Sequence, residues 1–120
     1  RSSWRSRRFR DDGAAMTVSF FALYRTPPDA DAFDSSYFGT HVPIVAGTPG
    51  LLENKVHRVK RQLVGEPEYY LIAELVFADA ESMKAAFKSP AWGASGANLQ
   101  EWGGMDLVTM FTTDGPGAAG

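Results

Sequence analysis

The chain has no cysteine, only two histidines and no long apolar run, and each shortage excludes a class of protein. Without cysteine there is no disulfide framework, no thiol nucleophile and no thiolate metal site. No apolar run approaches the roughly 18 residues that cross a bilayer, so we expect no membrane span. The lack of cysteine also fits a reducing compartment, and we therefore expect a cytoplasmic protein.

Several catalytic motifs are missing as well. The sequence holds no glycine-rich phosphate loop and no G-x-S-x-G motif, which argues against nucleotide binding and serine hydrolysis. His41 and His57 form no H-x-x-x-H pair, which argues against a metal site. We expect neither a metal nor a cofactor, although the residues alone leave haem binding through His41 open.

Basic residues gather at the start of the chain. Residues 1–15 hold five arginines and two aspartates, which leaves 7 basic and 12 acidic residues and a net charge of −5 from Met16 onward. An acidic body argues against nucleic-acid binding. We expect residues 1–15 to be an extension outside the fold, residues 16–114 to form one domain, and residues 115–120 to be a flexible tail.

Hydrophobic patterning predicts an α+β fold of the ferredoxin-like type. β-branched and aromatic residues predict strands, and apolar residues three or four apart predict helices. The expected strands are 17–25, 51–63 (with a bulge), 69–77 and 105–113, and the expected helices are 29–46 and 79–89, followed by a short, poor helix before Trp102. The order βαββαβ gives a four-stranded antiparallel sheet with the helices on one face.

Two of these strands are apolar on both sides. The segments 17–25 and 69–77 carry apolar side chains at nearly every position, so the sheet face without helices needs a cover. A second copy of the chain would supply it, sheet against sheet, around a shared barrel. The sequence therefore predicts a homodimer through the open sheet face.

His41 is the leading candidate for chemistry. Pro43 has no N–H and its ring crowds the carbonyl of Gly39, so we expect the helix to open there. An opened turn would direct the His41 ring toward the interior beside Tyr37, where an imidazole can move a proton near neutral pH. The alternative is a helix-end histidine that hydrogen-bonds a loose carbonyl.

Glu74 is the lone carboxylate of an apolar strand. Alternation places it with Tyr70, Ile72 and Val76, opposite the set that we expect to face the helices, so it should point into the barrel. There it could orient His41 or act as a base with a raised pKa. An ion pair with Arg58 or Lys60 on the neighbouring strand is the favoured alternative, because buried charge is usually paired.

Aromatic residues supply the candidates for contact with a ligand. Trp92 and Trp102 flank the weak final helix and could form a roof over a flat ring. Most buried aromatic residues serve packing. The expected substrate-binding residues are Tyr24, Phe38, Tyr70, Trp92 and Trp102.

Three stretches resemble a known family. They are LYRTPPDADAFDSSYFGTHVPIVAGTPGL (23–51), YYLIAELVFADAESMKAAFKSPAW (69–92) and MDLVTMFTT (105–113). Their pattern, above all F-x-x-x-Y-F-x-T-H-V-P-I-V followed by P-G-L, is similar to that of EthD-like proteins, named from ethyl tert-butyl ether degradation. The resemblance implies a subunit of the dimeric α+β barrel superfamily with a cleft lined by His41.

The resemblance implies less about chemistry, because related barrels serve many reactions. It favours a small cofactor-independent enzyme, of the monooxygenase or isomerase and cyclase type, that acts on an apolar aromatic, polyketide-like or ether-derived molecule. His41 would act as acid or base, and Tyr37 would hydrogen-bond a substrate oxygen. Two alternatives stay open: a non-catalytic dimeric binding or accessory protein for an oxygenase, and a barrel filled by side chains without a pocket.

Overall fold

The computed structural model describes residues 9–10, 12–13 and 17–115. The expected extension at 1–15 and the expected tail at 115–120 therefore lie largely outside the described residues. Two short strands, β1 (Phe9–Arg10) and β2 (Asp12–Gly13), pair with each other in parallel. They take no part in the main sheet.

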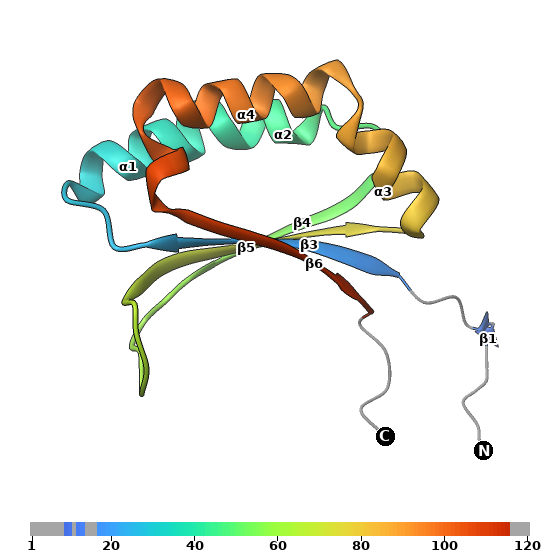
Figure 1. Cartoon of the computed structure of the whole chain (residues 1–120), viewed down its shortest axis with the longest axis horizontal. Coiled ribbons are helices and arrows are strands. Elements are labelled where there is room, and N and C mark those ends of the chain that lie inside the picture. Colours follow the sequence, from blue (N-terminus) through green and yellow to red (C-terminus); the bar gives the residue numbers. More distant parts are fainter. Residues whose placement is uncertain (1–8, 11, 14–16, 116–120) are drawn as a thin grey trace.

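The main sheet has four antiparallel strands in the order β4-β5-β3-β6. These strands are β3 (Val18–Arg25), β4 (Leu51–Arg58), β5 (Tyr69–Phe77) and β6 (Val108–Asp114). All the helices lie over one face of this sheet (Figure 1). The predicted ferredoxin-like βαββαβ fold is confirmed.

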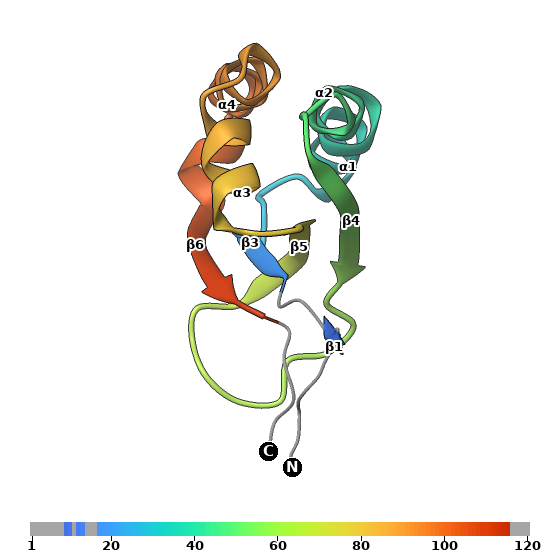
Figure 2. The same ribbon diagram turned by 90° about the vertical axis from the view of Figure 1, so that its right-hand side faces the viewer.

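The helices form two groups that stand side by side over the sheet, α2 above β4 and α4 above β6 (Figure 2). The first group is α1 (Ala30–Ser36), the π-helical turn η1 (Tyr37–His41) and α2 (Val42–Ala46). The second is α3 (Ala80–Phe87), α4 (Pro90–Trp102) and the 3₁₀ turn η2 (Gly104–Leu107).

Side-chain caps explain where three helices begin. The carboxylates of Asp29 and Asp79 accept backbone N–H bonds from Ala32 and Ser82, at 3.1 and 2.8 Å. The Ser89 hydroxyl accepts from the N–H of Trp92. Such caps satisfy N–H groups that have no partner inside the helix.

Three differences from the predicted elements exceed two residues. β4 ends at Arg58 rather than at residue 63, because its pairing with β5 stops opposite Leu71. The final helix is neither short nor poor, since Ser89 and Pro90 start it well and it spans 13 residues. The last strand begins at Val108 rather than Met105, because Gly103 in the left-handed region (φ 89°) ends α4 and η2 follows.

The core lies between the helices and one face of the sheet. Register places alternate residues of β3 and β5 on that face, and they are almost fully buried: Phe20, Ala22, Tyr24, Leu71, Ala73, Leu75 and Phe77. Phe33 of α1 and Leu99 of α4 close the core from above. Burial of each large side chain stabilises the fold by roughly 1.5–3 kcal/mol.

The opposite face of the sheet is also apolar. Phe21 of β3 pairs with Phe111 of β6, and their ring centroids lie 5.6 Å apart. Phe111 is 45% exposed, and no described helix covers this side of the sheet (Figure 1). The sequence expectation of an apolar face opposite the helices is therefore met in the subunit.

Candidate functional site

A π-helical turn places Tyr37 and His41 in the interior. The N–H of Val42 bonds the carbonyl of Tyr37 five residues earlier, and Val42 keeps helical angles (φ −57°, ψ −45°). The wider turn accommodates Pro43, whose nitrogen cannot donate. The helix thus widens and continues to Ala46 rather than opening at Pro43, which corrects the expected backbone while leaving His41 directed inward.

A cavity of about 110 Å³ lies between the sheet and the helices. Its walls are mostly apolar, from Phe20, Ala73, Leu75, Trp92, Leu99, Met105 and Met110. Met110 lies on edge strand β6, and its side chain both lines the cavity and is 39% exposed. This flexible side chain therefore lies between the cavity and solvent.

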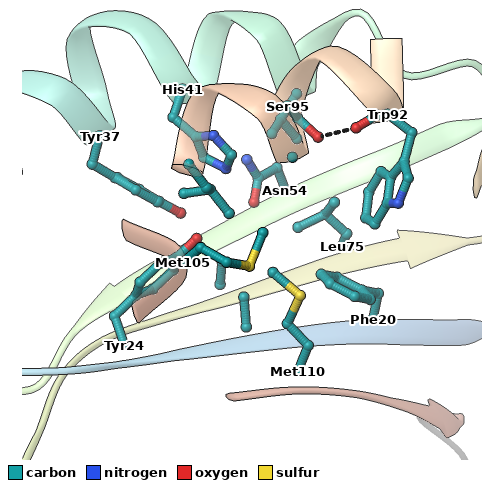
Figure 3. A pocket seen from close by; sticks show the side chains of 15 residues that line it. Phe20, Tyr24, Tyr37, His41, Asn54, Leu75, Trp92, Ser95, Met105 and Met110 are labelled. Carbon is teal, nitrogen blue, oxygen red and sulfur yellow. Dashed lines mark hydrogen bonds between the residues drawn. The ribbon is translucent and has the colours of Figure 1, made fainter. Parts of the chain in front are cut away.

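Five polar side chains line this otherwise apolar space: Tyr24 from β3, Tyr37 and His41 from η1, Asn54 from β4 and Ser95 from α4 (Figure 3). The Tyr37 ring centroid lies 5.3 Å from that of Tyr24 and 5.4 Å from that of His41. The two phenol hydroxyls point toward each other, and no hydrogen bond joins them to the other residues drawn. These groups are thus available to a ligand.

Burial sets the protonation of these groups. Desolvation raises the pKa of both Tyr24 and Tyr37 far above the ordinary tyrosine value, so both hydroxyls stay protonated donors. Desolvation lowers the pKa of His41, and a hydrogen bond to Asn98 opposes that shift. The cavity therefore holds a neutral imidazole beside two neutral phenols at pH 7.

Polar groups behind His41 form a connected chain. His41 Nδ1 lies 3.3 Å from Asn98 Oδ1, and Trp102 Nε1 donates to the same oxygen at 2.9 Å. Asn98 Nδ2 donates to Thr40 Oγ1 at 3.3 Å, and that hydroxyl donates to the carbonyl of Ser36 at 2.7 Å. Asn98, which does not line the cavity, thus links the imidazole to Trp102 and Thr40.

Asn54 and Asn98 were missed by the sequence reasoning. The oxygen of Asn54 is buried without a hydrogen-bond partner in the described part of the chain. Its direction depends on the register shift between Leu51 and Glu53. Asn98 left a weak signal, because Ser95, Asn98 and Trp102 recur at helical spacing on one face of α4.

Only two of the five predicted ligand-contact residues line the cavity. Tyr24 and Trp92 line the cavity, whereas Phe38, Tyr70 and Trp102 do not. Trp102 packs edge-on against Phe33 at 5.3 Å. Phe38 is 38% exposed and lies under the guanidinium of Arg58.

Tyr70 lies on a different side of the sheet from the one predicted. The β3–β5 register shifts between Tyr24 and Arg25, opposite Tyr70. The Tyr70 ring contacts Phe33 of α1, and its hydroxyl donates to Asp34 at 2.8 Å. A bulge of this kind moves one residue out of the alternation that the sequence prediction assumed.

Glu74 does face away from the helix-facing residues, as its alternation indicates. Its carboxylate accepts a hydrogen bond of 2.7 Å from Ser19 on β3, and not an ion pair with Arg58 or Lys60. Since the cavity lies on the other face of the sheet, Glu74 does not reach His41 within the subunit. The hypothesis that Glu74 orients His41 is therefore wrong for the single chain.

Two further observations bound the site. Another hollow of about 310 Å³ lies beside Trp102, and its carboxylates are Asp106 and Asp29, of which Asp29 caps α1. No cluster of three or more metal-ligating side chains occurs in the described ranges. Within the same ranges, no helix is long and apolar enough to span a membrane.

Comparison with known proteins adds a family. The model of the EthD domain matches residues 25–103. A crystal structure of an ethyl tert-butyl ether degradation family protein from Bacillus halodurans is 36% identical, with a TM-score of 0.75, over 81% of this chain and 96% of that chain. An uncharacterized 11.0 kDa protein from the thcB–thcC intergenic region of Rhodococcus erythropolis is 26% identical over 77% of this chain and 89% of its own length.

More distant structures share the fold. SnoaB, a cofactor-independent oxygenase from Streptomyces nogalater, is 16% identical with a TM-score of 0.60, over 88% of this chain and 97% of that one. A dimeric ferredoxin-like protein from Jannaschia sp. is 17% identical with a TM-score of 0.62, over 80% and 96%.

Proposed function

This chain belongs to the EthD domain family, and from that premise we propose that it is a small cofactor-independent enzyme acting on an apolar small molecule. One observation carries the proposal: the imidazole of His41 and the phenols of Tyr24 and Tyr37 meet in a cavity whose walls are mostly apolar. Structures with the same fold include a cofactor-independent oxygenase, so the fold is compatible with such chemistry.

The proposed first step is proton abstraction from a carbon beside a carbonyl. His41 takes the proton, and the electron pair of the broken C–H bond moves onto the carbonyl oxygen as an enolate. The hydroxyls of Tyr24 and Tyr37 donate to that oxygen, where the negative charge develops. The apolar walls exclude water and strengthen these interactions.

Two outcomes follow from the same enolate. Return of the proton at another carbon would complete an isomerisation, and transfer of an electron to dioxygen would start an oxygenation. Both share the step at His41, so one experiment tests them together. Which of the two reactions follows depends on the substrate.

Cavity size limits the substrate. The cavity has a volume of about 110 Å³. An engineered apolar cavity that binds benzene is larger, at about 150 Å³. A single small ring with one carbonyl fits this space after small shifts of Met105 and Met110 at the wall. A molecule with several fused rings needs a larger opening between the helices.

The test is deuterium incorporation from D₂O into phenylacetone and cyclohexanone, followed by NMR. The wild type should accelerate exchange, and His41→Ala should slow it about 10²- to 10⁴-fold. Gln100→Ala, on the exposed side of α4, serves as the matched control. Equal rates for wild type and His41→Ala would end the proposal, and ligand binding without any exchange would favour an accessory protein.

We also propose that the active form is a homodimer. Structures with this fold are described as dimeric in Jannaschia sp. and in Thermobifida fusca. The apolar face around Phe21 and Phe111 would lie between the two sheets. Glu74, on that same face, would then be enclosed at the interface with its bond from Ser19.

A further inference from the structure

We propose that Asn98 and Trp102 are positioning residues that hold neutral His41 with its proton on Nδ1 and its lone pair on Nε2, so that His41 enters the reaction as a base. The tautomer follows from hydrogen bonds alone. Its role in turnover rests on the function proposed above.

Two hydrogen bonds fix the orientation of the Asn98 amide. An indole N–H donates and never accepts, so the Asn98 atom 2.9 Å from Trp102 Nε1 must be the oxygen. A second constraint comes from Thr40, whose single hydroxyl proton is committed to the carbonyl of Ser36. The Asn98 atom that faces Thr40 Oγ1 must therefore be the donor Nδ2, and the two constraints agree.

The Asn98 amide in turn fixes which nitrogen of the His41 ring carries the proton. Asn98 Oδ1 is an acceptor only, so His41 Nδ1, 3.3 Å away, must carry the proton. A neutral imidazole has one N–H, and Nε2 is then the acceptor. Trp102 thus acts on His41 through Asn98 without lining the cavity.

The residues that line the cavity around the His41 ring carry no fixed charge. The titratable groups that line the cavity with His41 are the phenols of Tyr24 and Tyr37, from β3 and η1. The lining residues of α2, β4 and α4, among them Val45, Asn54 and Ser95, carry no charge. Since none of the described lining residues carries a carboxylate, the tautomer depends on the Asn98 amide.

The tautomer of His41 determines which proton transfer comes first in the reaction. A base with its lone pair facing a ligand removes a proton first and returns it later as an imidazolium. In the other tautomer, Nε2 would carry the proton and could only donate. Trp102→Phe keeps the ring that packs on Phe33 but removes the donor that orients the amide.

The experiment is ¹⁵N-resolved NMR of the His41 ring in the ligand-free protein. The wild type should hold a protonated Nδ1 and an unprotonated Nε2. Asn98→Leu and Trp102→Phe should raise the Nε2–H population several-fold, whereas Asn98→Asp should keep Nδ1–H because a carboxylate also accepts from both donors. Gln100→Leu removes an exposed amide from the same helix and should change nothing.

The activity arm separates this inference from the proposed function. Asn98→Leu should lower the kcat of exchange about 10- to 100-fold with a similar KM, as misorientation of a base does, and Asn98→Asp should restore most of the rate. Absence of exchange in every protein would end the proposed function and leave the tautomer result standing. An Nε2–H tautomer in the wild type, or one unchanged in Asn98→Leu and Trp102→Phe, would overturn the inference.

Discussion

At His41, burial and hydrogen bonding act on the pKa in opposite directions. The side chain is 6% exposed, which disfavours the charged imidazolium, and the bond to Asn98 partly offsets this effect. The lowered pKa keeps the ring neutral at pH 7. The residue that we propose as the base therefore also makes the folded protein sensitive to acid.

The stability of the protein should accordingly fall on mild acidification. Between the lowered pKa of folded His41 and the ordinary value of 6.5, the unfolded chain binds more protons at this position than the folded chain does. Stability therefore decreases as the pH falls through this window. Urea unfolding between pH 7 and pH 5 should give this slope in the wild type and a smaller slope in His41→Gln.

His57 offers the control for that measurement. It is exposed on β4, so His57→Gln controls for the replacement of a histidine by glutamine without the loss of a buried ring. If His41→Gln and the wild type have parallel free-energy curves across the window, burial of a neutral imidazole is not what shapes acid stability here.

At the scale of single elements, the π-helical turn and the end of α4 both depend on local backbone geometry. Gly39 in η1 has an ordinary negative φ, and a Cβ built there meets no atom within 4 Å. Gly103 also has open space around it, but its φ is +89°. Two glycines with similar room therefore differ in conformation alone.

Alanine substitutions at these two glycines should have opposite effects on the free energy of unfolding. Gly39→Ala should stabilise by up to about 1 kcal/mol, because glycine is a poor helix former. Gly103→Ala should destabilise by about 1 kcal/mol or more, since the left-handed cap of α4 is strained for a residue with a Cβ. Thermal and urea unfolding of both variants measure the difference, and equal effects would contradict it.

Elements with regular patterns were predictable, and irregular ones were not. Alternation in 69–77 identified β5 and placed Glu74 on the sheet face opposite the helix-facing residues. The bulge that redirects Tyr70 follows from pairing with β3 and has no signature in the strand itself. Pro43 marked a distortion of the helix correctly, but both a widened turn and an opened one relieve the loss of its N–H.

At the scale of the whole molecule, the site joins residues that are far apart in the chain. Asn98 follows His41 by 57 positions, and only the packing of α4 beside η1 brings their side chains together. Sequence patterns predicted both the fold and the inward direction of His41. They could not predict its partner, because spacing within one helix says nothing about which face of another helix it meets.

We expect the open sheet face to be the surface through which two copies of the chain associate. An apolar surface that includes Phe111, 45% exposed, favours burial against a second copy, because each buried Å² of apolar area contributes about 25 cal/mol. Phe111→Glu places a charge on this face, so the dimer should dissociate at micromolar concentration, with a sedimentation mass near 13 kDa. Ala94→Glu, on the exposed side of α4, should remain a dimer. A monomeric wild type would mean that the apolar face meets a different partner, and an undisturbed Phe111→Glu dimer would mean that the copies associate through another surface.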